Sequence, residues 1–224
     1  MLRHRTLPCP GRFQRRDFDF VAEVLSPEGA RCHLEKLWSD PDGMREMLDL
    51  KEVLHALLES PAMLRVTPGF YFYVLVRHGF VHAELKNAEL ADHVAGMLTK
   101  RVGADGGDPL LDVTRGFTHA AELISFIKTS RGRIRHHLQV AAGNQFLVLT
   151  GLYPDFIRKR HERGIAPGLD YYEAFAARAF RRAADGCGCA AGSSRHLYGT
   201  LAEALPQVRR ALNRIAEEFV FLGE

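Results

Sequence analysis

The sequence predicts an all-α fold, and three observations support this prediction. Apolar residues recur mostly at the three- and four-residue spacing of amphipathic helices. Dipeptides typical of helix starts, such as Asp-Pro and Thr-Pro, precede several of these periodic segments. No alternation of strands with helices is visible, and no hairpin signal joins two alternating segments. We therefore expect a single irregular multi-helix domain of about nine or ten helices.

Capping signals place the helices of the first half. Asp40-Pro41 and Thr67-Pro68 each combine an N-cap residue with proline at the first helical position. The segment after Thr67 is apolar almost all round, which indicates a helix buried on several sides, although its aromatic and β-branched residues also fit a strand. The expected helices are 17–24, 27–38 after Ser26, a short one from 41, one capped by Asp49, 68–84, and 88–102 after Asn87.

Helical periodicity continues through the second half. Residues 103–109 are rich in glycine and predict a flexible loop. Pro154 interrupts a long periodic segment, because proline lacks the amide donor and crowds the preceding turn. The expected helices are 118–129, 132–152, 154–163 ending at Gly164, 171–185 capped by Asp170, 194–205 and 206–222.

Composition agrees with a globular protein of 224 residues, with 46% hydrophobic and 25% charged residues. No apolar run reaches the roughly 18 residues that cross a bilayer, so we expect no membrane partner. Residues 1–16 contain five arginines and no apolar core, which predicts a flexible basic arm rather than a signal peptide. The all-helical domain is then expected over residues 17–224.

The charge is unevenly distributed. Residues 1–16 carry +5, and residues 131–163 carry seven basic against two acidic residues, again +5. Because the whole chain carries +3, the remaining residues carry −7. Such asymmetry is typical of an anion-binding face, although a basic tail and a solvated helix face explain it equally.

Histidines offer a possible metal site. His78 and His82 share one helix face at the i,i+4 spacing of zinc ligands, and Glu89 and His93 repeat that spacing. The di-metal signature of helical bundles needs Glu-x-x-His twice, and the chain lacks it. We therefore expect surface or hydrogen-bonded histidines, no metal and no cofactor.

The four cysteines indicate a reduced, cytoplasmic protein. Two of them form Cys187-Gly188-Cys189, which lacks the second pair or the histidines of a zinc site. We expect these cysteines to lie in a loop without function.

Asn144 interrupts an otherwise apolar helix. A buried amide needs hydrogen-bond partners, so one interpretation is that Asn144 bonds a neighbouring helix end, with Gly143 and Gly151 allowing close packing. The alternative is a pocket with a polar floor that includes Asn144 and Asp155. Its predicted ligand-binding residues are Asn144, Asp155, Arg158 and Tyr172. Arg77, which follows eight uncharged residues, is expected to reach the surface or to pair with Glu173 or Asp155.

Four segments carry a resemblance to a family. They are Gly143–Ile157, Tyr73–His78, Pro167–Glu173 and Ala211–Asn213. Together they resemble an uncharacterised family of bacterial all-helical proteins, over about residues 60–222. The resemblance implies a helical fold and a bacterial source, and it assigns no activity. The chain departs from the family at residues 187–192.

Two functions remain open at this point. The first is a helical binding or interaction module, whose basic faces receive an acidic protein or a nucleic acid. The chain has no clear helix-turn-helix pattern, and a charge of +3 is low for a DNA-binding protein. The second is an enzyme or a small-ligand binder with the inter-helix pocket around Asn144 and Asp155. The sequence identifies no catalytic residue.

Overall fold

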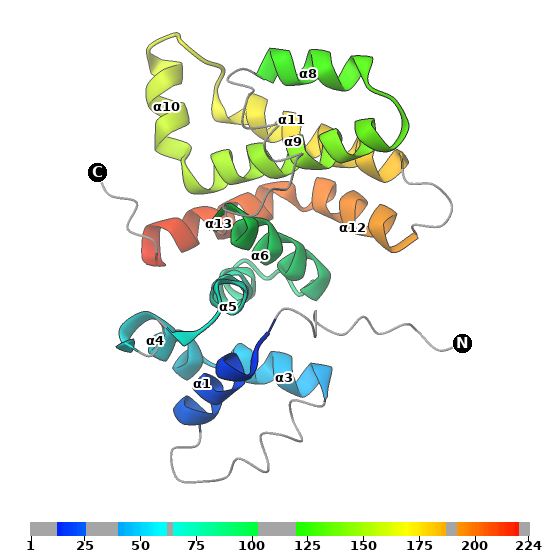
Figure 1. Cartoon of the computed structure of the whole chain (residues 1–224). Helices are drawn as coiled ribbons and strands as arrows, with labels where there is room; N and C mark the ends of the chain where they lie inside the picture. The colour runs from blue at the N-terminus through cyan, green and yellow to red at the C-terminus, as the bar shows by residue number, and fades with distance from the viewer. Residues whose placement is uncertain (1–12, 26–39, 62–64, 103–119, 187–191, 220–224) are drawn as a thin grey trace. The chain divides into compact units, whose positions relative to one another are not determined.

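The computed structural model describes residues 13–25, 40–61, 65–102, 120–186 and 192–219. These residues are about 85% helical, in eleven helices and without a strand, which confirms the all-α prediction (Figure 1). Within the same residues, every helix is too short or too polar to span a lipid bilayer. The predicted helix at 27–38, the loop at 103–109, most of the basic arm and all four cysteines lie outside the described residues.

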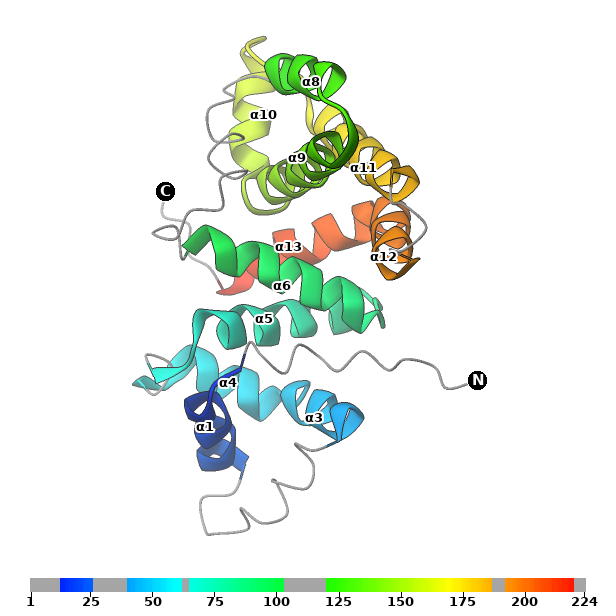
Figure 2. The same ribbon diagram turned by 45° about the vertical axis from the view of Figure 1, so that its right-hand side comes forward.

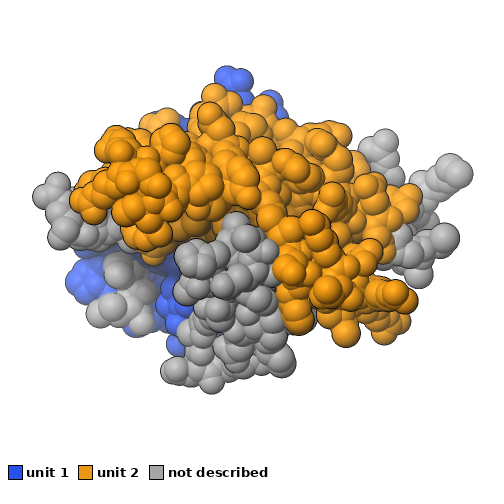
Figure 3. Space-filling model, turned by 90° about the horizontal axis from the view of Figure 1, so that it is seen from above, with its two compact units in different colours: residues 1–103 blue, residues 104–224 orange. Residues whose placement is uncertain are grey.

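The chain forms two compact units, residues 1–103 and residues 104–224 (Figure 3). Unit 1 contains α1 (Arg15–Leu25), α3 (Pro41–Leu48), α4 (Lys51–Glu59), α5 (Pro68–His82) and α6 (Ala88–Val102). Unit 2 contains α8 (Ala120–Thr129), α9 (Gly132–Leu152), α10 (Pro154–Glu162), α11 (Leu169–Asp185), α12 (Gly192–Glu203) and α13 (Leu205–Phe219). The single domain expected over residues 17–224 stays a prediction.

Local capping explains most of the helix starts. The Asp40 carboxylate accepts hydrogen bonds from the amides of Asp42 and Gly43, and the Thr67 hydroxyl accepts one from the amide of Phe70. The Asn87 side chain accepts from the amide of Leu90 at 3.1 Å. These caps satisfy amides that have no partner within their own helix, so they confirm three predicted starts.

Two predicted caps are wrong. Leu50, not Asp49, precedes α4 and makes no side-chain cap, because the Asp49 carboxylate binds Arg77 instead. Gly168, not Asp170, precedes α11, which places Asp170 in the first turn. A carboxylate there is still favourable, because it faces the positive end of the helix dipole.

A buried carboxylate on α1 joins this helix to the start of α5. Asp17, on α1, is fully buried and accepts hydrogen bonds from the amide and the hydroxyl of Thr67, at 2.6 and 2.8 Å. It also accepts from the amide of Gln14 at 2.7 Å. The start of α1 is thereby fixed to the start of α5, which packs against α4 and α6.

Helix α9 is central to unit 2. It contacts α8, α10, α11 and α13, and Figure 2 shows α8, α10 and α11 around it. Glycines allow the closest approaches: a methyl group on Gly143 would lie 2.7 Å from the Phe180 ring, and one on Gly151 would lie 2.8 Å from Cβ of Leu212. The predicted role of both glycines in close helix packing matches these contacts. Pro154 ends α9 as expected, with Tyr153 lying between α9 and α10.

We expect Gly151→Ala to lower the free energy of unfolding by about 1–3 kcal/mol, because the added methyl group overpacks the core. The contacted atom is a Cβ, which cannot rotate away from the clash. Gly199→Ala, in α12, is the matched control, since nothing lies within 4 Å of its added methyl group. That control should be neutral or more stable by up to about 1 kcal/mol. Urea denaturation of both variants measures the difference, and equal midpoints would contradict the close-packing argument.

Candidate functional site

The four predicted ligand-binding residues lie on three helices of unit 2. Asn144, on α9, is half-buried rather than fully buried, and Tyr172, on α11, is also half-buried. Asp155 and Arg158, on α10, are exposed and pair with each other at 2.9 Å. An exposed pair one turn apart contributes at most about 1 kcal/mol. The ligand-binding role of these four residues stays a prediction.

Tyr172 belongs to an aromatic cluster. Its ring stacks on Phe146 at 5.4 Å between centroids, and Phe146 meets the edge of Phe175 at 4.8 Å. Burial raises the pKa of the Tyr172 hydroxyl, which therefore stays protonated at neutral pH. Tyr172 thus packs α11 against α9.

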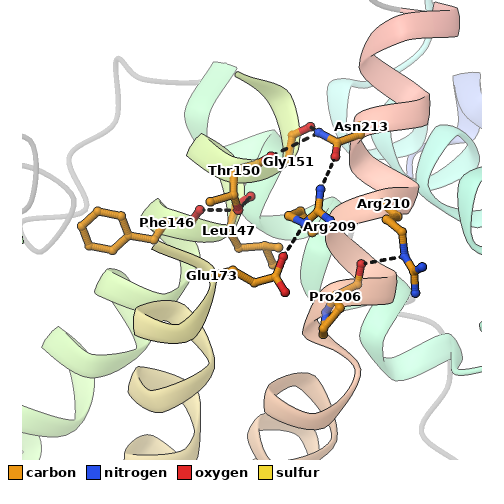
Figure 4. A network of polar contacts seen from close by, with 9 residues as sticks. All are labelled: Phe146, Leu147, Thr150, Gly151, Glu173, Pro206, Arg209, Arg210 and Asn213. Carbon is orange, nitrogen blue, oxygen red and sulfur yellow. Dashed lines mark hydrogen bonds and ion pairs between the residues drawn. The ribbon is translucent and has the colours of Figure 1, made fainter. Parts of the chain in front are cut away.

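Asn213 makes the type of interaction that the sequence suggested for Asn144. Its amide donates to the carbonyl oxygens of Thr150 and Gly151, at 3.1 and 2.5 Å, and so binds the end of α9 (Figure 4). Arg209 donates to the Asn213 side-chain oxygen at 2.6 Å and pairs with Glu173. This network satisfies carbonyls that the helix itself leaves without partners, and it joins α9, α11 and α13.

A second partly buried ion pair lies in unit 1. Arg77 donates two hydrogen bonds to Asp49, one of them at 2.9 Å, so the predicted partners Glu173 and Asp155 are wrong. Burial alone would lower the pKa of Arg77, but the hydrogen bond and charge of Asp49 raise it. The sequence showed that Arg77 needs a partner, but not that α3 ends beside α5.

Burial also raises the pKa of Tyr73, one turn before Arg77 on α5, to about 12.

The histidines of α5 have backbone partners. His78 is buried, and its Nε2 lies 3.2 Å from the carbonyl oxygen of Leu48, to which it donates. His82 Nδ1 lies 2.8 Å from the carbonyl oxygen of His78. Among the described residues, no three His, Cys, Asp or Glu side chains gather where they could hold a metal ion.

The structure reveals a different site, a cleft between α8, α9 and α11. It has two adjoining parts of about 470 and 290 Å³, which share Ile127, Lys128, Gln139 and Arg182. Arg135, Asp185 and Gly186 complete the larger part. Ile124, Tyr171, Phe175, Arg178 and Ala179 complete the smaller part. We call these two parts together the basic cleft; none of the four predicted ligand-binding residues lines it.

Cations of the basic cleft are available to a ligand. Lys128, Arg178 and Arg182 are exposed, and none of them makes an ion pair or side-chain hydrogen bond with another described residue. Arg135 is already used, because it donates to the carbonyls of Ser130 and Lys128 at the end of α8. Residues 120–186, which include α8 to α11, hold eleven basic against six acidic residues. The cleft therefore attracts negative charge.

Gln139 distinguishes the basic cleft from an ordinary charged surface. Six polar or charged side chains are buried among the described residues: Asp17, Thr67, Arg77, His78, Gln139 and Thr150. Five of these have hydrogen-bond partners within the described residues. Gln139 is only 7% exposed and has none there, yet it lines both parts of the cleft. Its amide atoms keep access to solvent through the cleft, so they can bond to water or to a ligand there.

Sequence reasoning missed the basic cleft. One signal was present: Phe175, Arg178 and Arg182 follow at spacings of three and four, which places an aromatic ring and two cations on one face of α11. Nothing in the sequence showed that Lys128 of α8 and Gln139 of α9 face the same space.

No protein-family model, curated protein or solved structure matches this chain. The argument for function therefore depends on the geometry of the site.

We expect His78 to make the protein less stable in mild acid. Burial lowers its pKa below the ordinary 6.5, outweighing the opposite effects of Asp49 and the Leu48 carbonyl. The unfolded chain then binds the proton more tightly, so the stability linked to this group is complete above pH 6.5 and is lost as the pH falls toward the folded-state pKa.

The test compares His78→Gln with wild type by urea denaturation between pH 8 and pH 5. The stability difference between the two proteins should shrink as the pH falls. His196→Gln is the control and should follow the wild-type profile, because His196 is exposed on α12 and is not among the groups that shift the pKa of His78. Parallel profiles for wild type and His78→Gln would show that His78 has no part in the acid sensitivity.

Proposed function

We propose that unit 2 is a binding module for an acidic ligand, which the basic cleft receives between α8, α9 and α11. The observation that carries this proposal is the convergence of three available cations, Lys128, Arg178 and Arg182, on one cleft. The amide of Gln139 opens into the same cleft and has no partner among the described residues. Preorganised donors around a concave surface are the usual features of an anion-binding site.

The described lining favours binding over catalysis. Its polar groups are an amide, an ammonium group, three guanidinium groups, the phenol of Tyr171 and one carboxylate, Asp185. These groups bind and orient an anion, whereas general acid–base chemistry commonly uses a group that titrates near the working pH. The proposal thus combines the charge of the first hypothesis from the sequence with the inter-helix location of the second.

We expect Arg182→Gln to weaken the binding of inorganic phosphate at least about tenfold, because a charge-assisted hydrogen bond contributes about 1.5–3 kcal/mol. Arg181→Gln is the matched control, since Arg181 is exposed on the same helix but does not line the cleft. Isothermal titration calorimetry at about 50 mM salt gives the dissociation constants. Equal affinities for the two variants would place the binding of this anion outside the cleft.

Gln139→Leu provides a second test with two measurements. Because the amide of Gln139 has no partner among the described residues and keeps access to solvent, its replacement by Leu should change the free energy of unfolding by less than about 1 kcal/mol. The same change should weaken phosphate binding, since the ligand loses a hydrogen-bond partner. A destabilised variant with unchanged affinity would show that Gln139 is structural.

A further inference from the structure

Resting on the proposed function, we infer that the ligand is an acid with a single anionic head and an apolar body. The two parts of the basic cleft differ in chemistry. The smaller part combines the aromatic and aliphatic side chains of Ile124, Phe175 and Ala179 with three cations, Lys128, Arg178 and Arg182. The larger part shares Lys128 and Arg182 and adds Arg135 and Asp185. A ligand that fills the smaller part therefore needs an apolar portion as well as a charge.

The anionic head belongs where the two parts meet. Lys128, Gln139 and Arg182 line both of them, so an ammonium group, an amide and a guanidinium group converge there from three different helices. Arg178 lies one turn from Arg182, about 6 Å along the axis, and lines the smaller part. A carboxylate or a phosphate monoester suits these donors.

A chain of negative charges fits less well. Asp185 lines the larger part and repels a second anionic group placed there. In the smaller part, Arg178 lies one turn from Arg182, so both cations serve the same head. Beyond them, Ile124, Phe175 and Ala179 offer a second charge no polar partner. One negative group at the junction of the two parts is therefore favoured over a polyanion.

The apolar wall is held in position before a ligand arrives. The Phe175 and Phe146 rings are roughly perpendicular, with their centroids 4.8 Å apart, and Phe146 stacks on Tyr172. Ile124 and Ile127, one turn apart on α8, also line this part. The 290 Å³ of the smaller part is close to the lower limit of small-molecule sites, which suits a short alkyl or a single aromatic group.

The experiment compares ligands with the same head. Inorganic phosphate supplies the head alone, hexyl phosphate adds an apolar body, and a twelve-residue oligothymidylate supplies a polyanion. Calorimetry on the full chain should show that hexyl phosphate binds at least about tenfold more tightly than phosphate, because each buried methylene strengthens binding about fourfold. The oligonucleotide should bind more weakly than hexyl phosphate.

Two variants show which residue binds the anionic head of the ligand and which residue contacts its apolar body. Arg182→Gln should weaken phosphate and hexyl phosphate alike. Ile124→Ser should weaken only hexyl phosphate, to the level of phosphate. Ile134→Ser is its matched control, because Ile134 is exposed on α9 and lines neither part of the cleft.

Each contrary result has a separate meaning. If hexyl phosphate and phosphate bind equally, and both depend on Arg182, the apolar body is wrong and the proposed function stands. If the oligonucleotide binds most tightly and its binding depends on Arg182, the single anionic head is wrong and the proposed function stands. If neither phosphate ligand binds, or if Arg182→Gln changes neither affinity, both the inference and the proposed function are wrong.

Discussion

The close approach of α11 and α13 to α9 is the constraint on which unit 2 depends. Gly143 and Gly151 leave the space that Phe180 and Leu212 fill, so at these points the helices meet across one side chain rather than across two layers of side chains. The network of Asn213 then fixes the end of α9 against the same neighbours. With α9 and α11 held in this way, the basic cleft has a rigid floor and wall, as preorganised binding requires.

Unit 1 is organised by buried charges instead. Asp17 and Asp49 each receive hydrogen bonds from α5 or its N-cap residue, although one lies on α1 and the other at the end of α3. A buried carboxylate is costly without such donors, so these partnerships specify which helices meet. The apolar faces alone would allow neighbouring helices to slide, whereas a carboxylate with two donors fixes one arrangement.

Helix positions could be predicted from the sequence far better than helix partners. Asp40, Thr67, Asn87 and Pro154 act within one turn of the chain, so their effects are local and readable. The partner of Arg77 could not be read, because it depends on where α3 ends in space. The basic cleft could not be predicted for the same reason: Asn144 is conspicuous in the sequence because it interrupts an apolar helix, whereas Gln139 is seen to line a cleft only when α8 and α11 are placed around it.

The contact between Asp17 and Thr67 also determines how unit 1 opens. The two residues lie 50 positions apart, and their hydrogen bonds close a long loop of chain. The closure entropy of such a loop is lost only when both ends are fixed together, so neither helix gains this contact by forming alone. The amide hydrogen of Thr67 has the Asp17 carboxylate as its acceptor. Its exchange with solvent deuterium therefore reports the separation of α1 from α5, however stable either helix is by itself.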